Sequence, residues 1–92
     1  FYYVYNINGG DSWRFVGTIR NGQSSSFLTV VNYSDGYGCA NVPIYNVNGS
    51  GDVTVLEMMS GVEYQRNAPT MKSTGLIVCL ESYGVQIFKY NY

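Results

Sequence analysis

The chain of 92 residues is 46% apolar and 12% charged, and it carries a net charge of −1. A chain of this length forms one small domain that buries only about 60% of the surface exposed in its unfolded form. Its 5 basic residues are too few for the cationic patch that nucleic-acid binding needs, and no segment approaches the roughly 18 consecutive apolar residues of a membrane span. Without histidine, the chain also lacks Ser-His-Asp and Cys-His catalytic sites and His-ligated zinc.

Apolar and polar residues alternate in the first part of the chain, which predicts short β-strands. We expect strands over residues 1–8, 13–20 and 26–33. Residues 8–11 read Asn-Gly-Gly-Asp and predict a tight hairpin, because glycine and asparagine adopt positive φ most easily. Residues 34–38 hold the longest run of turn formers, and we interpret them as the boundary between two halves.

The second part of the chain continues the same pattern. Its expected strands cover residues 42–48, 53–58, 62–66, 76–80 and 85–92. The first of them contains Pro43, which lacks the N–H of a strand ladder and so belongs at an edge or a strand start. Residues 67–74 contain Pro69 and few apolar residues, so we expect a mobile loop there. No segment is long enough to predict a helix.

A five-residue phrase, Tyr-Asn-Ile/Val-Asn-Gly, occurs at residues 5–9 and again at residues 45–49. This duplication predicts a single domain made of two similar halves, approximately residues 1–38 and 39–92. We expect an all-β fold, either an antiparallel β-sandwich or a Greek-key barrel of seven to eight short strands. The two halves would bury their apolar faces against each other.

A further pattern runs through the first half: a strand ending in tyrosine, a Gly-Gly hairpin, an aromatic return strand, and an Asn followed by a Ser pair. Its residues are Tyr5, Gly9, Gly10, Trp13, Phe15 and those of 21–26. This pattern resembles one motif of the βγ-crystallin family, whose Greek-key motifs occur in pairs. The resemblance implies a Greek-key fold and a weak calcium candidate at Asn21 and Ser25, because this chain has Gly22 where the family's calcium signature has a second Asn or Asp. The corresponding residues 69–74 of the second half lack the signature.

The two cysteines, Cys39 and Cys79, repeat the spacing of the phrase, about 40 positions. This spacing is not the Cys-x-x-Cys of a redox motif, and two cysteines without histidine fall short of a structural zinc site. We expect a disulfide that closes a loop of about 40 residues and stabilises the fold by roughly 4 kcal/mol. Two buried free thiols in a cytosolic protein are the alternative.

The low charge and the two cysteines together predict a secreted protein. The chain begins at Phe1 rather than methionine, which removal of a secretory signal would explain. Asn32 and Asn48 each begin an Asn-x-Ser tripeptide, so both are candidates for N-glycosylation if a eukaryotic cell exports the chain.

The 10 tyrosines, 4 phenylalanines and 1 tryptophan are the residues best suited to binding a partner, because they offer broad apolar surfaces. Four aromatic residues stand among other apolar residues on strand faces and are predicted to lie in the core: Trp13, Phe15, Phe27 and Phe88. The predicted binding residues belong to loops, strand ends or mixed strand faces, and most would gather at one end of the sandwich: Tyr37, Tyr83, Asp35, Asn67 and Tyr64. No cofactor is expected.

These residues predict a small secreted binding module, without enzymatic activity, that recognises a carbohydrate or a protein surface. Three of the 6 carboxylates lie in turns and the others stand among apolar strand residues, which disfavours a catalytic pair. One alternative is a structural subunit that forms homo-oligomers through its terminal aromatic strands, residues 1–8 and 85–92. A second alternative is a small secreted toxin or inhibitor on a crystallin-like scaffold.

Overall fold

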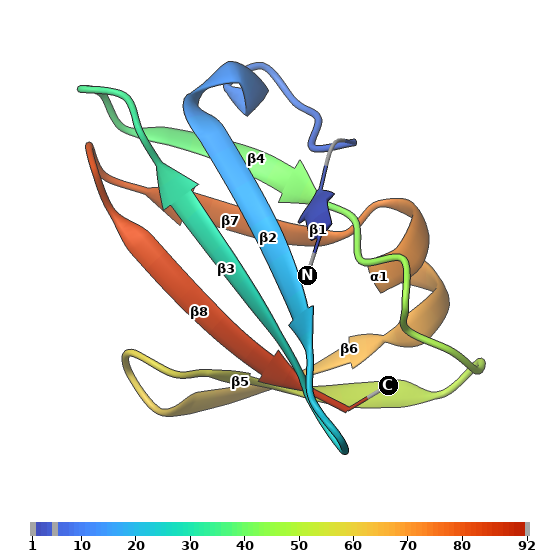
Figure 1. The fold of residues 1–92 in the computed structure, drawn as a ribbon. Helices are drawn as coiled ribbons and strands as arrows, with labels where there is room; N and C mark the ends of the chain where they lie inside the picture. The colour runs from blue at the N-terminus through green and yellow to red at the C-terminus, as the bar shows by residue number, and fades with distance from the viewer. Residues whose placement is uncertain (1, 5, 92) are drawn as a thin grey trace.

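The computed structural model describes residues 2–4 and 6–91, and these residues form eight antiparallel strands in two sheets together with one short α-helix (Figure 1). The prediction of an all-β, sandwich-like fold is therefore confirmed. No helix in the described part of the chain is long and apolar enough to cross a bilayer.

The larger sheet has six strands in the order β1-β2-β3-β8-β5-β6. Their bounds are Tyr2–Val4 for β1, Phe15–Asn21 for β2, Ser26–Asn32 for β3, Val85–Tyr90 for β8, Asp52–Glu57 for β5 and Val62–Asn67 for β6. Each strand runs antiparallel to its neighbour, and the longest pairing joins β2 to β3 through a short Gly-containing turn. The edges of this sheet are β1 and β6.

The second sheet has two strands, β4 (Gly38–Val42) and β7 (Leu76–Leu80), which lie across one face of the larger sheet (Figure 1). An isolated bridge between Asn8 and Asn41 adds a short piece of chain to the outer edge of β4. On the β7 side no described residue adds a strand. The second layer is thus much narrower than the first.

The core lies between the two sheets and follows the alternation of the sequence. On β3, every second residue from Ser26 to Asn32 is buried, and the residues between them are half-buried. The same inward face carries Ile19 of β2 and Val55 of β5, while Val78 of β7 belongs to the same cluster from the other sheet. Each such aliphatic side chain contributes roughly 1.5–3 kcal/mol through burial.

The segment that we expected to be a mobile loop, residues 67–74, is largely the helix α1 (Ala68–Ser73). The prediction was wrong because two helix-start signals outweigh the shortage of apolar residues. Asn67 is the N-cap, and its side chain accepts a hydrogen bond from the Thr70 N–H, while proline stands in the first turn, where its missing N–H costs nothing. Met71 is buried and anchors the helix to the core.

Two other expected elements are shorter than the alternation indicated. Of residues 42–48 only Val42 belongs to a strand; Ile44 and Val47 are still buried, so here an irregular segment fills the core. The expected strand 1–8 contains β1, and its Phe1 and Tyr5 lie outside the described residues. The tight hairpin at 8–11 is wrong, because the connection between β1 and β2 runs through the bridge at Asn8 and a 3-10 helix at Ser12–Arg14.

The two parts of the chain do not form one layer each. The larger sheet combines β1 to β3 with β8, β5 and β6, and both strands of the smaller sheet, β4 and β7, come from the second half except for Gly38. Residues 6–9 of the first phrase lie between two neighbouring strands of one sheet, whereas the phrase at residues 45–49 lies between strands of different sheets. The last strand, β8, lies inside the larger sheet and pairs with both β3 and β5.

Candidate functional site

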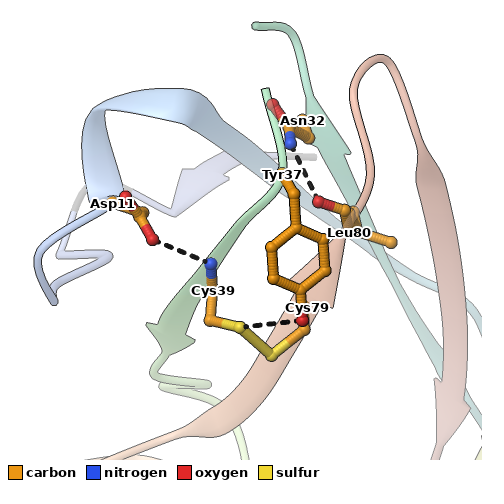
Figure 2. Close-up of a disulfide and its surroundings, with 6 residues drawn as sticks. All are labelled: Asp11, Asn32, Tyr37, Cys39, Cys79 and Leu80. Carbon is orange, nitrogen blue, oxygen red and sulfur yellow. Dashed lines mark hydrogen bonds between the residues drawn. A yellow bond between two sulfur atoms is a disulfide. The ribbon is translucent and has the colours of Figure 1, made fainter. Parts of the chain in front are cut away.

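A disulfide joins Cys39 of β4 to Cys79 of β7, which stand directly opposite each other (Figure 2). The predicted bridge is confirmed, and the free-thiol alternative is excluded. The Cys39 N–H donates to the Asp11 carboxylate at 3.2 Å, and the Tyr37 hydroxyl oxygen lies 3.5 Å from the Cys39 sulfur. The bridge therefore also orders the chain on both sides of β4.

Asn32, at the end of β3, is fully buried and joins the loop after β3 to β7. Its Nδ2 donates to the carbonyl oxygen of Gly36 at 2.8 Å and to that of Leu80 at 3.0 Å, and Figure 2 shows the second of these bonds. Its Oδ1 accepts from the N–H and the hydroxyl of Ser34. As a glycosylation candidate Asn32 is wrong for the folded protein, because the nitrogen that would carry the glycan is buried and donates twice. Asn48 is exposed and stays a candidate.

Arg14 fixes the neighbouring 3-10 helix to the same loop. Its Nη1 donates to the Ser34 hydroxyl at 2.9 Å, its Nε lies 3.5 Å from Asp11, and its guanidinium covers the Trp13 ring at 4.3 Å. A Cβ on Gly36 would stand 2.6 Å from Arg14 Nη1, so only glycine leaves room for the guanidinium in this position. The arginine therefore joins two segments, residues 11–14 and the loop after β3.

Four large aromatic side chains project from these loops into solvent, and we call them the aromatic end: Trp13, Tyr33, Tyr37 and Tyr83, with exposed fractions of 59%, 55%, 63% and 68%. The loops that carry them are bonded to one another. Tyr33 donates from its backbone N–H to Arg14 and from its hydroxyl to the Trp13 carbonyl, and the Tyr83 N–H donates to the Ser34 carbonyl at 3.2 Å. The rings therefore stand on an ordered base.

Trp13 was predicted to lie in the core, and this prediction was wrong. The alternation that placed it on the apolar face of a strand stops before β2, because residues 12–14 form a 3-10 helix with three residues per turn. Phe15, the first residue of β2, is buried as expected. The shift from helix to strand leaves the indole outside the sandwich.

Tyr83 has a backbone φ of 58°, and among the described residues it is the only residue other than glycine with a positive φ. It occupies the third position of a turn closed by the hydrogen bond from the Gly84 N–H to the Glu81 carbonyl at 2.9 Å. A left-handed conformation costs a residue with a Cβ about 1–2 kcal/mol. Bulky residues held in this way are concentrated at functional sites.

The structure brings Tyr37, Tyr83 and Asp35 together at the aromatic end, as the sequence predicted. Asn67 and Tyr64 lie elsewhere, on β6, and the Asn67 side chain is occupied in capping α1. In Figure 1 the loops after β3 and β7 lie at the end of the molecule opposite α1. The gathering of all the predicted loop residues at one end is therefore wrong for Asn67.

The calcium candidates serve other contacts. Asn21 Oδ1 accepts from the Ser26 hydroxyl and from Asn46 Nδ2, both at 2.8 Å, and the Ser25 hydroxyl donates to Asn91. Among the described residues no three or more His, Cys, Asp or Glu side chains cluster as metal ligands.

A groove of about 390 Å³ opens between the two sheets on the far side from β1, and we call it the edge groove. Its walls come from β5, β6, β8, β7 and α1, and its apolar side chains include Val55, Ile77 and Phe88. The predicted residue Tyr64 lines it, and the Arg66 guanidinium lies 4.9 Å from the Tyr64 ring centre. Neither the groove nor Arg66 was predicted from the sequence.

Glu57, at the end of β5, is a buried carboxylate that serves the β5–β6 turn. It accepts hydrogen bonds from the Met59 N–H at 3.0 Å and from the Ser60 N–H and hydroxyl, each at 2.7 Å. Burial alone would raise the pKa of Glu57, but these hydrogen bonds to the ionised form outweigh it and hold the pKa below the ordinary value. A carboxylate so fully bonded is a structural residue.

Comparison with known proteins shows the fold but no family. No family model and no curated protein matches the chain. A solved structure from Bacillus halodurans C-125, of a protein provisionally assigned as an α-N-acetylgalactosaminidase, is similar over 97% of this chain, with a TM-score of 0.71 and 18% identity. This chain spans only 20% of that protein's length. The resemblance to βγ-crystallins stays a prediction.

Proposed function

We propose that the chain is a non-enzymatic binding module that recognises a carbohydrate through the aromatic end. The observation that carries the proposal is the set of four exposed rings, Trp13, Tyr33, Tyr37 and Tyr83, on loops that are hydrogen-bonded to one another. Aromatic rings with a polar tip pack against the C–H faces of sugars and lose little conformational entropy on binding. Ordered loops reduce that entropy loss further.

Polar groups beside the rings supply the hydrogen bonds that sugar hydroxyls need. Asp35 is exposed in the same loop as Tyr37, and the Tyr37 and Tyr83 side chains, each of which ends in a hydroxyl, are largely exposed. The positive φ of Tyr83 supports the proposal, since the position would be better filled by glycine if only the turn mattered.

The fold comparison lends a second, weaker support. The similar structure belongs to a protein provisionally assigned as a glycosidase, so a domain of this shape occurs in a protein that is thought to act on a carbohydrate. The disulfide supports an extracellular site of action, because disulfides persist in oxidising compartments. The bonded state of Glu57 and the absence of histidine support the non-enzymatic part of the proposal.

A glycan array followed by calorimetry tests the proposal. We expect binding to at least one glycan class, and a loss of roughly tenfold or more in affinity for Tyr37→Ala and for Trp13→Ala, because buried aromatic contacts each carry about 1–3 kcal/mol at binding sites. Tyr64→Ala is the matched control, since it removes a tyrosine from β6, outside the aromatic end. An array without binding at high micromolar protein, or equal losses in all three variants, would refute the proposal.

A further inference from the structure

The free edge of β7 carries unpaired backbone groups. Cys39 and Asn41 of β4 direct their N–H groups away from β7, toward residues 8–11. In an antiparallel pair of strands, two residues that stand directly opposite form one of two kinds of pair. Either both direct their N–H and C=O groups toward each other, or both direct them away from the partner strand. Their partners Ile77 and Cys79 therefore direct N–H and C=O groups to the free edge, where no described residue bonds them.

The edge groove lies along this free edge. Ile77 and Cys79 line it, and the Ile77 side chain is 74% exposed. The opposite wall is the inward face of β5 and β6, where Val55 is buried but Tyr64 is exposed at the sheet's edge. A six-stranded sheet is here covered by a layer of two strands, and β7 is the edge strand of that layer on the side of the groove.

Arg66 brings an unneutralised positive charge into the groove. Its guanidinium lies over Tyr64, and its Nη1 donates to the carbonyl of its neighbour Gln65 at 2.9 Å. No carboxylate of the described residues comes within ion-pair distance of it. A cation in this setting favours a carboxylate from a partner, since Arg binds carboxylates through paired N–H donors.

We propose that the edge groove binds an extended peptide segment of a partner protein, which adds as a third strand beside β7 and places an acidic side chain against Arg66. A peptide fits because Ile77 and Cys79 stand two residues apart on β7, so the N–H and C=O groups that they offer repeat about every 6.6 Å, the length of two residues of strand. The backbone of an extended peptide has the same repeat and can pair with them. Alternate side chains of that strand would enter the groove and meet Val55 and Phe88. The site is separate from the aromatic end except at the disulfide, where Tyr37 lies against Cys39 and Cys79 lines the groove.

A phage-displayed library of random nonapeptides, selected on the disulfide-bonded protein, tests this proposal. We expect the enriched peptides to alternate apolar residues and to carry an Asp or Glu. In ¹⁵N NMR with the synthetic peptides, amide exchange at Ile77 and Cys79 should slow by at least about tenfold, because both N–H groups become hydrogen-bonded. Chemical shifts at Trp13 and Tyr33 should not move, whereas Tyr37 is no control because its hydroxyl lies against the disulfide.

Two variants examine the charge and the backbone bonds separately. Arg66→Glu should weaken the acidic peptides by roughly tenfold or more, whereas Arg20→Glu, the same change at an exposed position of β2, should not. Ile77→Pro should abolish binding and leave the β4–β7 ladder intact, because that N–H faces the free edge. Any of three results would overturn the proposal. The selection could yield no peptide that binds with a Kd below about 1 mM, the bound peptides could protect neither amide from exchange, or the two arginine variants could weaken binding equally.

Discussion

Replacing Tyr83 by glycine should stabilise the domain, although it removes a side chain. The left-handed conformation, with φ of 58°, costs a residue with a Cβ about 1–2 kcal/mol, and glycine avoids this cost. Glycine loses about 0.5–1 kcal/mol of conformational entropy more on folding. Since the Tyr83 side chain is exposed, little burial is lost, and the net gain is about 0.5–1 kcal/mol.

Thermal unfolding followed by circular dichroism measures this gain. The unfolding entropy of 92 residues is about 190 cal/mol/K, so Tm should rise by roughly 3–5 °C. Tyr83→Ala is the control, because it removes the same ring but keeps the Cβ in the left-handed conformation. If Tyr83→Gly proved no more stable than Tyr83→Ala, the backbone at this position would carry no strain and the argument for a functional tyrosine would lose its physical basis.

Three further predictions concern the residues that hold the sandwich together. The double variant Cys39→Ser/Cys79→Ser should lose about 4 kcal/mol of unfolding free energy in urea, the loop-closure value for 40 residues, and a loss below about 1 kcal/mol would contradict it. Asn32→Ala should lose about 2–3 kcal/mol, because it leaves the carbonyls of Gly36 and Leu80 without a donor; stability within about 0.5 kcal/mol of wild type would count against this. Glu57→Gln should be less stable than wild type above pH 4.5, and the difference should shrink as the pH falls through the lowered folded-state pKa of Glu57. Urea titrations at neutral and acidic pH check this, and a difference that grew with acid would reverse the sign of the argument.

Most of the strands and the bridge could be predicted from the sequence, but β4 was not, because its residues 38–42 follow directly on a turn-rich run and include few large apolar side chains. Residues 76–80 form β7 as expected, and the shared spacing of the cysteines matched their place on opposing strands. The order of the strands could not be predicted, because the place of β8 between β3 and β5 depends on contacts between distant segments that no local period records. A count of strands does not determine how they pair.

The candidate sites show the same limit. Tyr37 and Tyr83 were predicted from turn-rich sequence around exposed tyrosines, which is a local signal. Trp13 was missed because a single 3-10 turn changes which face of the chain it occupies. Asn67 was misplaced, although an asparagine two residues before a proline is a readable helix start. Arg66 and the edge of β7 become a site only when two sheets are stacked.

The position of the disulfide also determines how the domain would respond to force. If the two ends were pulled apart, β1 to β3 and β8 would extend, but the chain between Cys39 and Cys79 would stay closed as a covalent loop. That loop holds about 140 Å of contour length at 3.4 Å per residue, and it contains β5, β6 and α1. Reduction of one bond would release this length, so the length to which the domain can be stretched depends on the redox state of its surroundings.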